Sequence, residues 1–154
     1  KSKILLKYIM GYVESNLLNG ENVIAKAKIH RAVFISAIVI LIPAIVGIIN
    51  KDDRLSFICF GSFIAALIHG FIVLKTNELA ITNQRIIGKK GLISRETAEL
   101  KYEKIESISV MQSILGRILK FGTIVVRGTG GTAVSFQFVA NPVAFKNKAM
   151  EKIG

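Results

Sequence analysis

The sequence contains one cysteine, Cys59, and two prolines among 154 residues. A single cysteine excludes an intramolecular disulfide framework and a cysteine-rich zinc site. Thirteen glycines with so few prolines exclude collagen-like and proline-rich low-complexity chains. Hydrophobic residues make up 51% of the chain, which excludes general intrinsic disorder.

The last 80 residues contain no aspartate, histidine or cysteine. Ser-His-Asp and Cys-His nucleophile systems, and transition-metal sites, therefore cannot be assembled from this segment. Two glutamate pairs remain, Glu96 with Glu99 and Glu103 with Glu106, but basic residues are interleaved with them. Solvated surface charge explains these pairs better than catalysis, so we expect no enzymatic activity, no metal and no cofactor.

Charge and hydropathy point in different directions. The formal net charge is +11, whereas the mean hydropathy is +0.51, an unusual pairing for a soluble protein. A chain that places its apolar residues in a bilayer and its charges beside that bilayer satisfies both values. The sequence begins with Lys1 rather than Met, which is consistent with a missing initiator or short leader.

Two long uncharged runs follow each other closely. Ala32 to Ile49 has eighteen residues, and Leu55 to Leu74 has twenty. As helices they would be about 27–30 Å long, which matches the hydrocarbon thickness of a bilayer. The alternative, a pair of buried core helices, requires the small remainder of the chain to cover helices that are apolar on every side. We therefore predict a transmembrane hairpin over residues 32–74, with residues 50–54 as its loop.

The distribution of Lys and Arg predicts the orientation of this hairpin. The loop holds two basic and two acidic residues, whereas six Lys/Arg precede Ala32 and thirteen follow Leu74. Under the positive-inside rule, both termini are expected in the cytoplasm and the loop outside.

Small residues recur every four positions within the two runs. They are Pro43 and Gly47 in the first run, and Ser62, Ala66 and Gly70 in the second. Small residues at this spacing allow helix backbones to approach closely, so we predict that these five pack the hairpin. The ordinary small-residue content of membrane helices is the alternative explanation.

After Lys75, short alternating runs replace the long apolar ones, and glycine and asparagine separate them. The GTGGT connection at residues 128–132 predicts a β-hairpin rather than a phosphate-binding loop, because a strand and not a helix follows it. Asn141-Pro142 predicts the start of a C-terminal helix over residues 143–152. The expected strands cover residues 78–82, 85–87, 92–94, 97–101, 105–112, 122–127 and 133–139. Together they suggest a small barrel or bent sheet with a closing helix.

The leader, residues 1–31, shows a different pattern. Residues 8–18 predict a short helix, and residues 23–29 predict a strand with Lys26 and Lys28 on one face. Because the leader and the C-terminal segment are expected on the same side of the membrane, this strand is a candidate to pair with the C-terminal sheet.

Short motifs occur in order along nearly the whole chain. LLNGE at residues 17–21 precedes the uncharged runs, ITNQRII at 81–87 and KGLI at 90–93 follow them, and LGR at 115–117 and FGT at 121–123 stand nearer the C-terminus. In this order they resemble the bacterial pleckstrin-homology-like membrane proteins of the YdbS type. The resemblance implies an α+β fold, with a two-helix transmembrane hairpin followed by a seven-stranded pleckstrin-like barrel (residues 75–154) and its C-terminal helix. It also implies the bacterial inner (cytoplasmic) membrane, but no defined activity.

Basic residues are in surplus after Leu74, with thirteen Lys/Arg against six Glu and a net charge of +7. The inositol-lipid pocket of eukaryotic pleckstrin domains is not expected, because only Asn83-Gln84 joins the first two strands. Nucleic-acid binding is not expected either, since the few aromatic residues have core-like spacing. The charge either sets topology and solubility or contacts anionic lipid, at about 1 kcal/mol for each Lys or Arg near the surface. The candidate lipid contacts are Arg85, Lys89, Lys90, Arg95, Lys101 and Lys104.

These observations lead to three functional hypotheses. The first is a membrane-anchored, non-enzymatic scaffold or protein-interaction module at the cytoplasmic face, with an unidentified protein partner or self-association. The second is a domain that binds or senses anionic membrane lipids. The third is a small transporter or channel subunit, and the only residue that supports it is His69, the most polar member of the second run. Two helices cannot enclose a pore without oligomerising.

Overall fold

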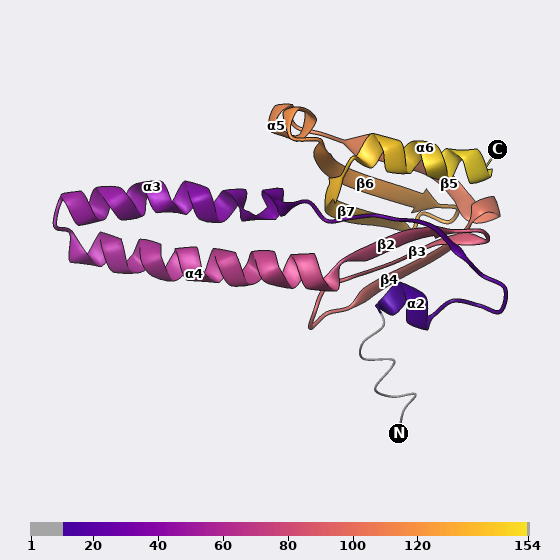
Figure 1. The fold of residues 1–154 in the computed structure, drawn as a ribbon, viewed down its shortest axis with the longest axis horizontal. Coiled ribbons are helices and arrows are strands. Elements are labelled where there is room, and N and C mark those ends of the chain that lie inside the picture. Colours follow the sequence, from indigo (N-terminus) through magenta and orange to yellow (C-terminus); the bar gives the residue numbers. More distant parts are fainter. Residues whose placement is uncertain (1–10, 154) are drawn as a thin grey trace, which may run out of the picture.

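The computed structural model describes residues 11–153, in which a pair of long helices projects from one end of a two-sheet domain (Figure 1). The helices are α2 (Tyr12–Ser15), α3 (Ile35–Ile49), α4 (Asp53–Thr76), α5 (Ile114–Ile118) and α6 (Pro142–Ile153), with 3-10 turns η1 (Arg31–Phe34) and η2 (Tyr102–Lys104). The strands are β1 (Val23–Lys26), β2 (Glu78–Thr82), β3 (Arg85–Lys90), β4 (Glu96–Lys101), β5 (Ile105–Met111), β6 (Phe121–Gly128) and β7 (Ala133–Ala140). The part of the predicted leader helix before residue 11 lies outside the described residues.

The two uncharged runs form helices that are long and apolar enough to cross a membrane. Arg31–Ile49 and Asp53–Thr76 have mean hydropathies of 3.0 and 2.3 over their most apolar stretches. Polar side chains cap the starts of both: Nδ1 of His30 accepts the Ala32 N–H at 3.0 Å, and the Asp52 carboxylate accepts the Leu55 N–H at 3.1 Å. These caps satisfy backbone donors that a helix start otherwise leaves unpaired.

Glycines lie at the two ends of the contact that α4 makes with η1 and α3. A Cβ added to Gly70 would lie 2.5 Å from the Phe34 ring, and one added to Gly47 would lie 2.9 Å from the Ser56 hydroxyl. The Phe34 ring also packs edge-on against Phe71, with centroids 5.3 Å apart. Close approach of these helices therefore depends on the missing side chains at both glycines.

The rest of the helix contact differs from the predicted four-residue stripes. Pro43 and Ser62 are exposed and Ala66 is half-buried, while Ala44 and Cys59 are buried instead. Each step of four residues advances about 40° around a helix of 3.6 residues per turn, so a strict four-residue stripe rotates out of a straight contact.

The first sheet has the order β1-β2-β3-β4 and is antiparallel throughout. Its edge strand β1 comes from the leader, with Lys26 opposite Ala80 of β2, so the predicted pairing of leader and C-terminal sheet is confirmed. The strand predicted at residues 92–94 is wrong, because these residues form a turn after Gly91, whose φ is +86°. The count of seven strands is reached only because the leader supplies one.

The second sheet has the order β5-β6-β7. Beyond β1 the leader continues to Ile29, which forms a bridge with Val139 of β7, so the leader contacts both sheets. Among the described strands, β4 and β5 are not hydrogen-bonded neighbours, because the chain passes between the sheets through η2. The predicted barrel is therefore not closed, and consists of two sheets that the leader joins along one side.

The core lies between the two sheets, and α6 covers one side of it (Figure 1). Phe136 of β7 is its largest fully buried side chain, and a Cβ on Gly88 of β3 would lie 2.5 Å from that ring. Helix α6 begins at Pro142, close to the predicted start, and buries Phe145 and Ala149 on one face. The other core residues are Ala27, Leu79, Ile81, Ile86, Ala98, Ile108, Ile124, Val126, Val134 and Val139.

The β6–β7 connection is the predicted hairpin. Gly130 and Gly131 adopt φ values of +95° and +82°, a region that side chains disfavour. The Gly128 N–H donates to the Thr132 carbonyl at 2.8 Å and closes the turn. No helix starts here, so the segment is not a phosphate-binding loop.

Candidate functional site

The six basic candidate residues lie at opposite ends of the first sheet. Lys89 is opposite Glu78, the first residue of β2, which follows directly after α4. Lys90 and Arg95 flank the adjoining turn, whereas Arg85 and Lys101 are paired at the far end of the β3–β4 ladder. Lys104 follows in η2, beyond Lys101.

The two ends of β3 are too far apart to act on one flat charged surface. Five strand steps separate Arg85 from Lys90, or about 17 Å at 3.3–3.4 Å each. Exposed charges are screened over about 8–10 Å at physiological salt. A charged surface at the end of the sheet that adjoins α4 could therefore contact Lys89, Lys90 and Arg95. It could not also contact Lys101 or Lys104 at the other end.

The β3–β4 turn, which adjoins the end of α4, is held in place by local contacts. The Gly91 N–H donates to Oδ1 of Asn77 at 3.3 Å, which ties the β3–β4 turn to the end of α4. Lys90 Nζ lies 3.0 Å from the Glu96 carboxylate and 3.3 Å from the Ser135 carbonyl. Arg95 is exposed, and Ile93 at the tip of the turn is 97% exposed.

Arg85 is buried inside the domain and is not a surface contact. Its Nε and Nη2 donate to the two carboxylate oxygens of Glu21 at 2.9 and 3.0 Å, and Nη1 donates to Glu99. Nη2 also donates to the Asn16 carbonyl at 2.8 Å. The hydrogen bonds that Arg85 donates to Glu21 raise the pKa of Arg85 above its ordinary value, against the opposing effect of burial. We therefore remove Arg85 from the lipid-contact candidates.

Glu21 is the acidic centre of this buried network. Burial works to raise the pKa of Glu21, but hydrogen bonds from Arg85, the Leu18 N–H and the Thr82 hydroxyl outweigh it and hold the pKa below its ordinary value. The Thr82 hydroxyl donates to Glu21 at 2.7 Å. The network fastens the leader to β2 and β3, which is a structural role.

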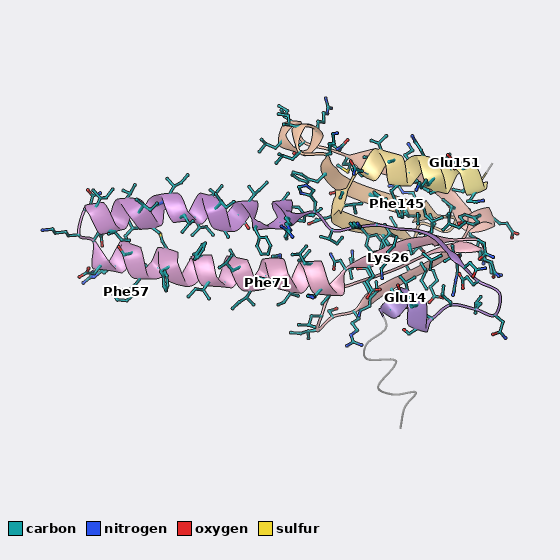
Figure 2. All side chains as sticks on the ribbon, viewed as in Figure 1. Glu14, Lys26, Phe57, Phe71, Phe145 and Glu151 are labelled. Atoms are coloured by element: carbon teal, nitrogen blue, oxygen red, sulfur yellow. The ribbon has the colours of Figure 1, made fainter. Side chains whose placement is uncertain are left out.

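A second polar cluster fastens α2 to the same sheet. The Glu78 carboxylate accepts the N–H groups of Tyr12 and Val13 at 2.9 and 3.2 Å. Lys26 Nζ lies 2.9 Å from Glu14 and 3.4 Å from Glu78, and Figure 2 shows Lys26 and Glu14 side by side. The leader from residue 11 onward is thereby part of the folded domain.

One exposed apolar surface of the domain was not predicted from the sequence. We name it the α5 tip: Met111, Ile114, Leu115, Ile118 and Leu119, all exposed, with exposed Arg117 and Lys120 among them. A sequence signal was available, because ILGRILK at residues 114–120 combines apolar and basic residues, and no Asp or Glu occurs between Glu106 and Glu151.

A groove of about 340 Å³ lies beside the α5 tip. Its lining residues are Met111, Gln112, Ser113, Phe121, Gly122, Thr123, Gln137 and Phe138, none of them charged. The Phe121 ring stacks between Phe138 and His30, with centroids 6.0 and 5.4 Å away. Without a charged lining residue, this groove offers no ion pair to an anionic ligand.

Within residues 11–153, no three His, Cys, Asp or Glu side chains come together as a metal site. His30 is occupied as a cap and a stacking partner, and His69 is exposed on α4.

Two comparisons found proteins similar to this chain. A solved DUF1696-family protein with a pleckstrin-homology domain from Shewanella loihica is similar at 11% identity and a TM-score of 0.37, covering 51% of this chain and 72% of that one. No curated protein matches the chain. The family model described as "Bacterial PH domain" matches residues 17–150, from the leader through both long helices to α6. The chain therefore belongs to the bacterial PH domain family.

Proposed function

We propose that this protein is a membrane-anchored, non-enzymatic module of the bacterial inner membrane. In this proposal the α3–α4 hairpin crosses the bilayer, both termini are cytoplasmic, and the PH-like domain is held at the inner surface. There it acts as a scaffold or protein-interaction domain.

The exposure of the two long helices carries the proposal. In their most apolar stretches, only 28% of the residues in the first helix and 11% in the second are buried. Large side chains such as Ile42, Ile49 and Phe57 face outward, and Figure 2 shows Phe57 far from the domain. A core helix of a soluble protein would bury such residues, since each contributes about 1.5–3 kcal/mol when removed from water. A bilayer provides that environment.

The test is a labelling experiment on the full-length chain in intact cells. In a Cys59→Ala background, one variant carries Arg54→Cys in the loop region and another carries Lys148→Cys on α6. A membrane-impermeant maleimide should label Arg54→Cys from outside, and should label Lys148→Cys only after the membrane is opened. Equal labelling of both in intact cells would refute the proposed topology, as would release of the protein by alkaline carbonate.

A second candidate function is binding to anionic lipid, supported by the position of Lys89, Lys90 and Arg95 at the hairpin end of the sheet. In a chain whose residues 31–76 are replaced by a short Gly-Ser linker, neutralising these three residues should weaken salt-dependent binding to anionic vesicles. Neutralising Lys101 and Lys104 at the far end is the matched control and should have less effect. Equal effects of the two variants would contradict this candidate.

A further inference from the structure

We propose that the α5 tip is a second membrane contact, which inserts its apolar side chains into the lipid interface beside the hairpin. This inference rests on the proposed function, because it assumes that α3 and α4 cross the bilayer. The hairpin would then tether the domain, and the α5 tip would fix the orientation of the domain on the surface.

The exposure of the tip is the first argument. Ile114 and Ile118 are 78% and 69% exposed, and Leu115 and Met111 are also more than half exposed. A short segment of this kind ordinarily turns such side chains into a core. Here five exposed apolar side chains gather on one short segment, and a group of exposed apolar residues marks an interaction site.

Local hydrogen bonds hold the loop around α5 in the shape that exposes these apolar side chains. The Ser113 hydroxyl accepts the Gly116 N–H at 3.1 Å and caps α5, while Gln112 Nε2 donates to the carbonyls of Gly116 and Phe121 at 3.1 and 2.9 Å. A Cβ on Gly116 would lie 2.7 Å from the Phe121 carbonyl oxygen. These local hydrogen bonds satisfy backbone groups of the loop, and the apolar side chains are left outside.

The location of the tip is the second argument. Phe121 follows α5 closely in the chain, and its ring stacks on His30, which caps the start of the first long helix. The Asn141 N–H donates to the Lys120 carbonyl at 2.8 Å, and the neighbouring Ala140 N–H donates to the Lys28 carbonyl at 2.8 Å. Figure 1 shows α5 at the end of the domain from which α3 and α4 project. A bilayer that holds the hairpin would therefore lie at the level of the α5 tip.

The charge around the tip favours lipid as the occupant. Arg117 and Lys120 lie within it, and no acidic residue occurs between Glu106 and Glu151. Apolar residues flanked by Lys and Arg suit an interface with an anionic leaflet. A second copy of the tip would instead bring like charges together, which is unfavourable.

The chain has no tryptophan, so single tryptophans can report on single positions. Three full-length variants are required: Ile118→Trp in the tip, Phe60→Trp in α4, and Met150→Trp on α6. Each is reconstituted in vesicles of phosphatidylglycerol and phosphatidylcholine, with or without bromine on the acyl chains of the phosphatidylcholine. Figure 2 shows Glu151, the neighbour of Met150, at the far end of the domain, so that site serves as the control.

Bromine should reduce the emission of Phe60→Trp and Ile118→Trp, and should leave that of Met150→Trp unchanged. Quenching of Phe60→Trp without quenching of Ile118→Trp would overturn this inference and leave the membrane anchor standing. A blue-shifted but unquenched Ile118→Trp would show that protein covers the tip, and would also overturn it. No quenching of Phe60→Trp would refute the proposed function and this inference together.

Discussion

Arg85 of β3 and Glu21 of the leader form a bidentate ion pair although they are 64 residues apart in the sequence, with N–O distances of 2.9 and 3.0 Å. The Glu21 side chain is fully buried and that of Arg85 is only 10% exposed. The whole α3–α4 hairpin is inserted in the chain between these two residues, so the pair joins the parts of the domain that precede and follow it.

Breaking this pair should destabilise the domain strongly. Replacing Arg85 by Met leaves the Glu21 carboxylate buried without its cation, and such changes cost about 3–5 kcal/mol. The expected result is a clear fall in the thermal unfolding midpoint of the full-length chain in detergent. Lys101→Gln, at an exposed position opposite Arg85, is the control and should change stability by less than about 0.5 kcal/mol. A similar fall in both variants would count against the network.

Acid should unfold the domain partly through Glu21. Because the folded state holds the pKa of Glu21 below its ordinary value, the unfolded state takes up the proton more readily. This contribution to stability is complete above the ordinary pKa of about 4.3, and is lost as the pH falls through the lower folded-state pKa. Unfolding midpoints measured between about pH 7 and pH 3 should decline less steeply in Glu21→Gln than in the parent. Parallel curves would contradict the assignment.

Gly88 should not accept a side chain. A Cβ there would lie 2.5 Å from the Phe136 ring and 3.0 Å from the Glu78 carbonyl oxygen, and both groups are fixed within the folded domain. Overpacking of this kind typically costs about 1–3 kcal/mol, so Gly88→Ala should lower the denaturation midpoint. Ser107→Ala at an exposed position of β5 is the comparison and should be nearly neutral.

The hairpin offers a matched pair of glycines on α4. A Cβ on Gly70 would lie 2.5 Å from the Phe34 ring, whereas one on Gly61 meets nothing within 4 Å. Gly70→Ala should therefore loosen the contact between the helices, and Gly61→Ala should be neutral or slightly stabilising because alanine favours helix. Thermal unfolding in detergent measures the difference. Equal effects would show that the helices do not depend on this close contact.

Deleting the leader should prevent the domain from folding, although most of its strands follow the hairpin. A fragment of residues 75–154 lacks β1, the Ile29 bridge and Glu21. A chain in which a short Gly-Ser linker replaces residues 31–76 retains all three. We expect dispersed amide resonances from the linked chain and poor dispersion from the fragment. A well-folded fragment would show that the leader is dispensable.

Local features of the fold could be predicted from sequence because local chemistry determines them. An uncharged run of eighteen or twenty residues forms a long helix whatever surrounds it, and Asn141-Pro142 starts a helix at that point. The turn at Gly130-Gly131 likewise follows from glycine's tolerance of positive φ. These features do not depend on distant partners.

The tertiary structure alone decided which residues meet across the chain. Arg85 reads in sequence as one more basic residue, and only the arrival of Glu21 from the leader makes it a buried partner. Ile93 is of a residue type that favours strands, yet residues 92–94 do not pair with any described strand and form an exposed turn. The apolar residues of α5 stay exposed, while Gln112 and Ser113 hydrogen-bond to the backbone of Gly116 and fix the shape of the loop. Burial and pairing depend on contacts between distant segments, and the spacing of residues along one segment does not contain that information.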